Sequence, residues 1–264
     1  MIKYSMYMEN DSFFHRIDPR VKIFISFFIL LTGILFTEAD QLFVIFVSVF
    51  LMLRFGAKVP VRTFMKYIKP ILPIVVILLV MWPFFKSSGN VLVEFWKIKI
   101  TDDGILIGVA MALRILTMIS ATFVLLTTTQ QKDIISALTT MGMPYEYGLT
   151  LVIALRYIPT LAGMAQTIMD AQRSRGLELD KGNVMSRIRK YVPILAPLIV
   201  GAIRMAQELA IAIDSRAFGH GKRTYINTIK MSGKDWTVMA LAVALFASMV
   251  YLRFWGTPSE LAFF

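Results

Sequence analysis

Long apolar blocks separated by short polar connections constrain the fold of this chain more than any other feature. A membrane span needs about 20 mostly apolar residues, and a helix satisfies its own backbone hydrogen bonds in lipid. Only 17% of the residues are charged and 57% are hydrophobic, which is unusual for a water-soluble domain. We therefore predict an all-α, polytopic integral membrane protein. The blocks expected to span are Val21–Phe36, Leu42–Phe55, Pro70–Phe85, Gly104–Thr129 and Trp236–Leu252.

The first block follows a helix-start signal. Asp18 is a residue type that caps helix N-termini, and Pro19 suits the first helical turn, where its missing N–H is not needed. The block begins after about twenty mixed residues, which is late for a secretory signal peptide. We expect a membrane helix that starts at this Asp-Pro pair.

Lysine and arginine alternate between the connections. The stretch up to Lys22 has four, 37–41 has none, 54–69 has five, 86–103 has three, 130–235 has fourteen of the 28, and the tail has one. Cytoplasmic connections carry such an excess, so the pattern predicts a cytoplasmic N-terminus and five spans in the plasma membrane. Because the positive charges flank apolar blocks, we read the net charge of +11 as membrane topology and expect no nucleic-acid partner.

The connection between the fourth and fifth spans is unusually long and apolar. Tyr145–Met169 and Val192–Ile213 are hydrophobic but are interrupted by arginine, proline and glycine. Either could be a further span, yet their polar residues are too many for helices that face lipid. We expect both to lie across the cytoplasmic face. The resulting division is an N-terminal membrane part (1–129), a coupling-helix module (130–235) and a final span with its tail (236–264).

An internal repeat lies inside this module. Met164–Gly176 and Met205–Ala217 agree at six of thirteen positions, and both copies run to a Ser-Arg pair. One such ending is explained by helix-stop preferences alone, because Arg suits the negative helix end and Gly the left-handed position. Two copies at one spacing on the basic side indicate a docking device for two similar partner surfaces.

These residues carry a resemblance to a known family. The chain resembles the transmembrane T component of energy-coupling factor transporters, the CbiQ/EcfT-like family, over nearly its whole length. The matching segments are Asp18–Lys22, Leu155–Thr160, Ala171–Gly176 and Asp214–Gly219. The chain departs from the family pattern in three places: Ser174 and Ser215 replace Ala, and Ala217 stands where the family often has Gly.

The resemblance implies a non-catalytic subunit of an ATP-driven importer. Two cytoplasmic ATPases hydrolyse ATP, one membrane-embedded S component binds a micronutrient, either a vitamin or a transition-metal ion, and the T component connects them. Arg175 and Arg216 are then the residues that contact the ATPases, and Ser174, Gly176, Ser215 and Ala217 shape the two tips. No cofactor and no catalytic or metal site is expected in this chain.

Two other functions stay open. A conventional ABC permease would bind its own substrate and usually carries one coupling segment per subunit. An intramembrane transferase would need acidic metal ligands or a nucleophile–base pair, for which the nearby acidic residues are Asp170, Glu178, Asp180 and Asp214. His15 and His220 have no ligand-spaced companions, and the loop 219–224 fails the P-loop spacing.

Polar residues in the fourth span need a structural account. Arg114 lies in the middle of an apolar block, where we expect it to pair with a neighbouring polar group or carbonyl. The hydroxyl residues Thr117, Ser120, Thr122 and Thr127–Thr129 are expected to bond their own helix or a neighbouring one.

Overall fold

The structure is a computed structural model, and it describes residues 6–8, 10, 12–85, 91–95, 98–178, 183–219, 231–251 and 253. Helices dominate these residues, as predicted. The chain divides into two compact units, Met1–Met141 with Ile229–Phe264, and Gly142–Thr228. The sequence-based division into 1–129, 130–235 and 236–264 describes functional parts of the chain and not compact units, and it stays a prediction.

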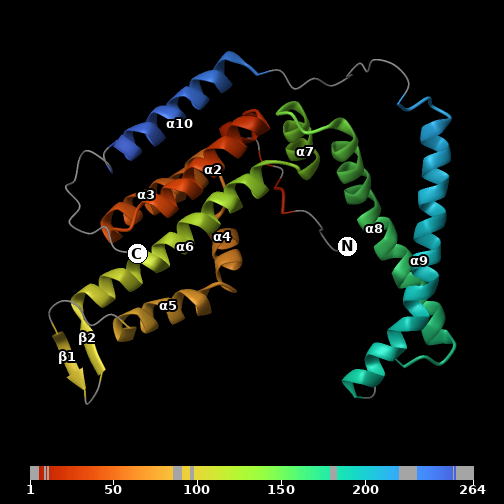
Figure 1. The fold of residues 1–264 in the computed structure, drawn as a ribbon, viewed down its shortest axis with the longest axis horizontal. Coiled ribbons are helices and arrows are strands. Elements are labelled where there is room, and N and C mark those ends of the chain that lie inside the picture. Colours follow the sequence, from red (N-terminus) through yellow and green to blue (C-terminus); the bar gives the residue numbers. More distant parts are fainter. Residues whose placement is uncertain are drawn as a thin grey trace. The chain divides into compact units, whose positions relative to one another are not determined.

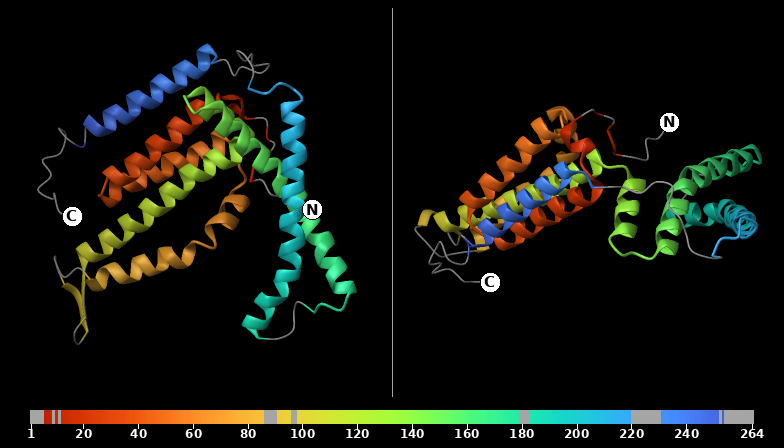
Figure 2. Two further views of the ribbon diagram at one scale, coloured as in Figure 1. Left: turned by 45° about the vertical axis from the view of Figure 1, so that its right-hand side comes forward. Right: turned by 90° about the horizontal axis from the view of Figure 1, so that it is seen from above.

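The first unit is a bundle built around one long helix (Figure 1). α6 (Asp102–Thr128) packs against α2 (Pro19–Leu35), α3 (Ala39–Leu51) and α5 (Leu72–Phe85), and α10 (Gly233–Tyr251) packs against α2. The shorter helices are α1 (Phe13–Arg16), the π-helix η1 (Met52–Gly56), α4 (Val61–Ile68) and α7 (Gln131–Thr140). The two views in Figure 2 show α2, α3, α6 and α10 running side by side.

Small residues let α6 approach its neighbours closely. A Cβ added at Gly108 would meet the backbone oxygen of Leu79 on α5 at 3.4 Å. Ala110 and Ala121 are also buried. Helices in membranes associate through such close contacts, because the hydrophobic effect does not drive apolar helices together in lipid.

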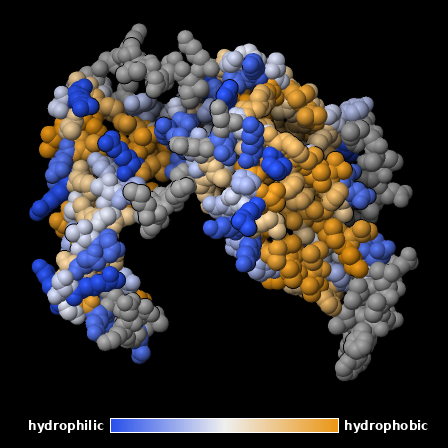
Figure 3. Space-filling view, turned by 180° about the vertical axis from the view of Figure 1, so that it is seen from behind, coloured by the Kyte–Doolittle hydropathy of each residue, from blue (hydrophilic) through white to orange (hydrophobic). Residues whose placement is uncertain are grey.

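The core lies between α3, η1, α4 and α6. Its buried members are Phe36, Leu42, Ile45, Val49, Leu53, Ala57, Val59, Phe64, Ile68, Ala110, Phe123 and Val124. Many other large apolar side chains face outward, and Figure 3 shows a broad hydrophobic surface over the helices of this unit. An exposed apolar surface of this extent is expected of a protein that lies in lipid.

Several polar groups of α6 donate to backbone oxygens of the same helix or of a neighbouring one. The hydroxyls of Thr117 and Ser120 donate to backbone oxygens one turn earlier on α6, at 2.8 and 2.6 Å. Arg114 Nη2 donates to the backbone oxygen of Phe36, the C-cap of α2, at 2.9 Å. Both findings match the structural roles predicted from the sequence.

The second unit is an antiparallel helical hairpin of α8 (Tyr145–Ser174) and α9 (Val184–Asp214). The helices meet where a Cβ at Gly201 would lie 2.7 Å from the sulfur of Met164. Nearer the turn, Gln172 Nε2 donates to Pro193 O at 3.5 Å. In both contacts, Gly201 with Met164 and Gln172 with Pro193, the two residue numbers add up to the same value. The two helices therefore keep one antiparallel register along the hairpin.

Among the residues that the structure describes, length and composition identify five helices that are long and apolar enough to cross a membrane: Ala39–Gly56, Asp102–Thr128, Tyr145–Ser174, Ile188–Asp214 and Gly233–Tyr251. A sixth is counted if α4 and α5, which are bent by 62° at their junction, form one broken span. Three of the predicted spans lie within these helices, apart from a terminal residue or two, and a fourth, Pro70–Phe85, lies in the bent pair. The first predicted span corresponds to α2, whose 17 residues extend about 25 Å. The expectation that α8 and α9 lie across the membrane face stays a prediction.

A β-hairpin was not expected from the sequence. Val91–Phe95 (β1) pairs antiparallel with Ile98–Thr101 (β2) between α5 and α6. The alternation of apolar and polar residues over Ile98–Thr101 is a strand signal, but two strands of five and four residues are easily overlooked beside long helices.

Candidate coupling site

The end of α8 forms a complete Schellman motif. Gly176 adopts φ +88°, in the left-handed region that favours glycine. The N–H of Leu177 donates to Gln172 O at 3.0 Å, and the N–H of Gly176 donates to Arg173 O at 2.9 Å. These two bonds satisfy carbonyls that a helix end otherwise leaves unpaired, so the tip has a defined geometry.

The end of α9 repeats this geometry bond for bond. Ala217 adopts φ +54°, although it carries a Cβ. The N–H of Phe218 donates to Ile213 O at 3.3 Å, and the N–H of Ala217 donates to Asp214 O at 2.9 Å. The sequence repeat is therefore also a structural repeat, with alanine in a conformation that costs an L-residue roughly 1–2 kcal/mol.

The two arginines occupy equivalent places, immediately before the left-handed residue. Both Arg175 and Arg216 are exposed. In the part of the chain that the structure describes, no hydrogen bond or ion pair occupies either guanidinium group. The preceding serines bond their own helices, Ser174 to Asp170 O and Ser215 to Ala212 O, each at 3.0 Å. Each tip thus presents a charged fork on a backbone that is already ordered.

The antiparallel register places the tips at opposite ends of the hairpin. The ring of Phe218, just after the second tip, lies 6.2 Å from that of Tyr145 at the start of α8. The first tip follows the last residue of this helix, which is 30 residues long and therefore extends roughly 45 Å. The two arginines cannot enter one binding pocket together, but they can reach two separate surfaces.

Two contacts near the tips could not be read from the repeat. The tilted contact between the rings of Phe218 and Tyr145 supports the second tip. Beside the first, Lys190 Nζ donates to Glu178 O at 2.7 Å. Both contacts join residues that are distant in sequence, and no short motif indicates them.

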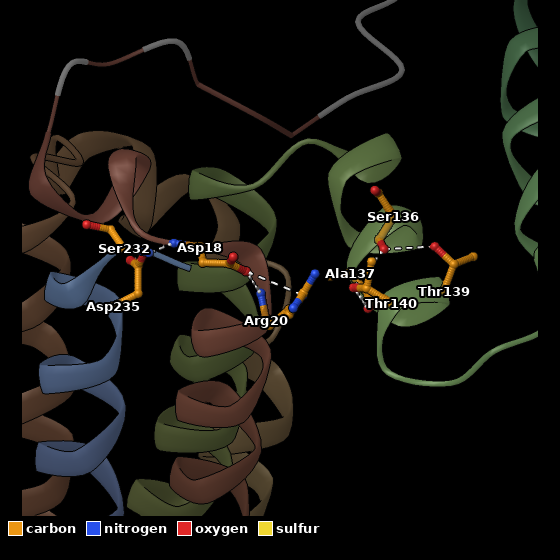
Figure 4. Close-up of polar contacts among 8 residues, drawn as sticks. All are labelled: Asp18, Arg20, Ser136, Ala137, Thr139, Thr140, Ser232 and Asp235. Atoms are coloured by element: carbon orange, nitrogen blue, oxygen red, sulfur yellow. Dashed lines mark hydrogen bonds and ion pairs between the residues drawn. The ribbon is translucent and has the colours of Figure 1, made fainter. Parts of the chain in front are cut away.

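A second polar site lies in the first unit, where α2 and α10 begin (Figure 4). Asp18 caps α2 as predicted, because its Oδ1 accepts from Arg20 N at 2.8 Å. Asp235 Oδ2 accepts from Ser232 N at 2.8 Å and its Oδ1 accepts from Asp18 N at 3.1 Å. One carboxylate therefore joins the starts of two helices through residues that are 217 positions apart in the sequence. The Ser-x-x-Asp spacing at 232–235 is a capping-box signal that could have located this carboxylate.

Lys22 extends this site to the end of α6. Its side chain is buried, and Nζ donates to Thr128 O at 3.0 Å and to His15 O at 3.3 Å. Lys22 lines a cavity of about 300 Å³ together with Asp18, Asp133 and Asp235. A buried ammonium among carboxylates is costly unless it is paired and hydrogen-bonded. We read this buried charge cluster of Asp18, Lys22 and Asp235 as the joint that fastens α2, α6 and α10.

Those acidic residues weighed for an enzyme that the structure describes are not gathered into a group that could hold a metal. In the described ranges, no group of three or more His, Asp or Glu side chains is arranged to hold a metal ion. Asp170 bonds Gln166 at 3.0 Å and pairs with Arg173 at 3.5 Å. Asp180, His220 and most of the loop 219–224 lie outside the described residues.

Comparison with known proteins agrees with the sequence motifs. The model of the cobalt transport protein family, CbiQ, matches residues 10–226. The energy-coupling factor transporter transmembrane protein EcfT of Clostridium kluyveri is 32% identical over 265 residues, covering 96% of this chain and 97% of its own. The EcfT proteins of Exiguobacterium sibiricum and Streptococcus thermophilus are 31% and 32% identical, and each alignment covers 94% of this chain and 97% of the relative. The chain therefore belongs to the CbiQ/EcfT family, the transmembrane T components of energy-coupling factor transporters.

Proposed function

We propose that this T component transmits ATP hydrolysis by two partner ATPases to one membrane-embedded S component. The observation that carries the proposal is the pair of matching helix tips, each with an exposed arginine before a left-handed residue. Two equivalent tips fit two copies of one partner surface, or two closely similar ones.

Arginine suits this task for physical reasons. Its guanidinium stays charged at any physiological pH and offers a planar fork of donors that matches a carboxylate. Arg175 and Arg216 would each enter an acidic groove on one ATPase, and the separation of the two tips along α8 supports contact with two different subunits. Ser174, Gly176, Ser215 and Ala217 hold the tip backbones in place by the bonds described above.

A rigid link between the tips would let the ATPases move the hairpin as one body. The close contact of Gly201 with Met164 and the bond from Gln172 to Pro193 lie along that link. ATPase closure could thereby reach the S component in the membrane. The S component would select the substrate, which we place in the class of vitamins or transition-metal ions.

We also propose that the N-terminus and both tips are cytoplasmic, in the plasma membrane. The segment 130–235 carries fourteen of the 28 basic residues, which supports this side. ATP is available to the partner ATPases only there.

The test is the composition of the native complex and its dependence on the two arginines. The chain purified from its own membrane in mild detergent should carry ATPase subunits in a two-to-one ratio. Losing one partner of a desolvated charge pair at an interface costs roughly 2–5 kcal/mol, about 30- to several-thousand-fold in affinity. Arg175→Ala and Arg216→Ala should each abolish ATP-driven uptake, and the double variant should lose ATPase attachment most completely.

The matched control is Arg204→Ala, which removes an exposed arginine from α9 away from either tip. It should leave both uptake and the two-to-one ratio close to normal. Lysine at 175 or 216 should rescue only in part, because a point charge cannot replace the bidentate fork. One ATPase per chain, or normal uptake by Arg216→Ala, would contradict the proposal.

A further inference from the structure

The short helix α4 is fixed to the core along one side. Phe64 and Ile68 are buried, and the Phe64 ring lies 5.7 Å from that of Phe123 on α6. The ring of Tyr67 lies 5.0 Å from the same phenylalanine. Three side chains on one face therefore hold α4 in place, and its remaining faces are free to meet something outside the bundle.

The outward side of α4 is divided into two strips. Val61 and Met65 form an apolar strip and are 42% and 56% exposed. At about 100° per residue, Arg62, Lys66 and Lys69 fall together on the adjacent strip. All three cations are exposed. A helix with an exposed apolar strip beside a cationic strip is typical of a membrane interface, where one strip enters the acyl boundary and the other meets head groups.

The positive charge continues ahead of the helix without any acidic residue to neutralise it. Arg54 and Lys58 are exposed, so cations recur every fourth residue from 54 to 66. The sequence contains no Asp or Glu between Asp40 and Glu94. A purely solvated surface would gain solubility from mixed signs, whereas a run of one sign produces a field that attracts anions.

The angle of α4 agrees with a position in the interface. α4 and α5 are bent by 62° relative to each other. If α5 lies along the bilayer normal, α4 is closer to the membrane plane than to that normal. The contacts with Phe123 put α4 near the C-terminal end of α6, which is also the end where Lys22 meets Thr128. In the proposed topology this end is cytoplasmic.

We infer that Arg62, Lys66 and Lys69 form a docking surface for the head groups of anionic phospholipids, and that Arg54 and Lys58 add to the positive field around it. The cations bind the lipid phosphates, and Val61 and Met65 enter the acyl boundary beneath them. The occupant is a lipid and not an acidic protein surface, because the exposed apolar strip runs alongside the charges and α4 is bent by 62° from α5, the helix that follows it. The inference uses the proposed function only to assign the side of the membrane.

The test titrates the purified full chain with phosphatidylglycerol or phosphatidylcholine and follows the first bound lipid by native mass spectrometry. Phosphatidylglycerol should bind more tightly, and high salt should reduce the difference. Each cation near an anionic surface contributes roughly a five-fold factor, so Lys66→Gln/Lys69→Gln should weaken phosphatidylglycerol binding about tenfold or more. Lys132→Gln/Lys234→Gln is the matched control, since it removes two exposed lysines from the starts of α7 and α10.

The outcomes separate the possibilities. The inference holds if only the α4 pair weakens phosphatidylglycerol binding, the unfolding temperature is unchanged, and Lys66→Arg/Lys69→Arg restores the affinity. Equal weakening by both pairs, or equal affinity for the two lipids, would overturn it. It would also fail if Lys66→Gln/Lys69→Gln removed ATPases from the native complex without changing lipid binding. The ATPase ratio reports separately on the proposed function.

Discussion

Gly176 and Ala217 hold the same place in two equivalent helix tips, yet only one of them lacks a Cβ. Their φ angles are +88° and +54°, so both are left-handed. A side chain at this position is strained by its own backbone, and a Cβ added at Gly176 would meet no atom within 4 Å. The difference between the tips is therefore a matter of backbone energy, not of packing.

This asymmetry predicts opposite effects of two reciprocal substitutions. Gly176→Ala should destabilise the chain by about 1 kcal/mol, because alanine must adopt a positive φ. Ala217→Gly should stabilise it by roughly 0.5–1 kcal/mol, after the greater freedom of glycine in the unfolded chain is subtracted. The measurement is thermal unfolding of the purified chain in detergent. Changes of the same sign would show that the two tips are not equivalent.

Loss of Lys22 should destabilise the fold. It is 4% exposed and lies among Asp18, Asp133 and Asp235. Lys22→Met removes the ammonium that donates to Thr128 O and His15 O and leaves these two carbonyls without that donor, a change that costs about 1–3 kcal/mol. The unfolding temperature and the yield from membranes should both fall sharply.

The control for this prediction is Lys234→Met. Lys234 is exposed and is next in sequence to Asp235 of the buried charge cluster. Its substitution should change stability by at most about 0.5 kcal/mol, as expected for surface positions. If the two methionine variants unfold at the same temperature, the buried charge cluster does not fasten the helices.

At the scale of the elements, the sequence predicts helix ends better than helix placement. The Asp18–Pro19 start and both Ser-Arg tips could be predicted because caps and left-handed residues are local chemistry. The bend between α4 and α5 and the link from Asp18 to Asp235 could not be predicted, because they depend on contacts between distant residues. Composition likewise cannot decide whether α8 and α9 cross the membrane.

The candidate site shows the same limit. The equivalence of Arg175 and Arg216 could be predicted from the sequence repeat. Each arginine comes eleven positions after the methionine that begins its copy of the repeat. Their location at opposite ends of the hairpin was not visible. It follows from the antiparallel register, which Met164, Gly201, Gln172 and Pro193 establish across the two helices.

The contact between α8 and α9 gives a prediction that compares two helical glycines. A Cβ at Gly163 on α8 would meet no atom within 4 Å, whereas a Cβ at Gly201 on α9 would meet the Met164 sulfur at 2.7 Å. Gly163→Ala should stabilise the chain by about 0.5–1 kcal/mol through helix propensity. Gly201→Ala should gain less, because the flexible Met164 must move, and Gly201→Leu should separate the helices.

Two measurements check this pair. The unfolding temperature of Gly163→Ala should be higher than that of the parent chain, and that of Gly201→Leu should be lower. ATP-driven uptake should fall in Gly201→Leu even where both ATPases still co-purify, since the tips remain intact while the link between them is loosened. Normal uptake by Gly201→Leu would show that the hairpin need not move as one rigid body.

At the scale of the whole molecule, the first unit has two chemically different ends. The C-cap of α2 at Phe36 lies beside Arg114 of α6. The start of α2 lies beside Thr128 through the bond from Lys22. α2 and α6 therefore run antiparallel, with the Asp-Pro start of α2 and the last turn of α6 at one end. The turn after α2, which has no basic residue, lies at the other end.

This polarity predicts which positions can be labelled from outside the cell. The chain has no cysteine, so single cysteines give an unambiguous signal. Asp40, Lys58 and Asn183 are all exposed and therefore equally available to a thiol reagent once the membrane is opened. In intact cells a membrane-impermeant reagent should label Asp40→Cys and leave Lys58→Cys and Asn183→Cys unlabelled. Permeabilised cells provide the control, because all three positions should then react. Labelling of Asn183→Cys from outside would place the connection between α8 and α9 on the wrong side for any contact with ATPases, and the proposed coupling role would fail with it.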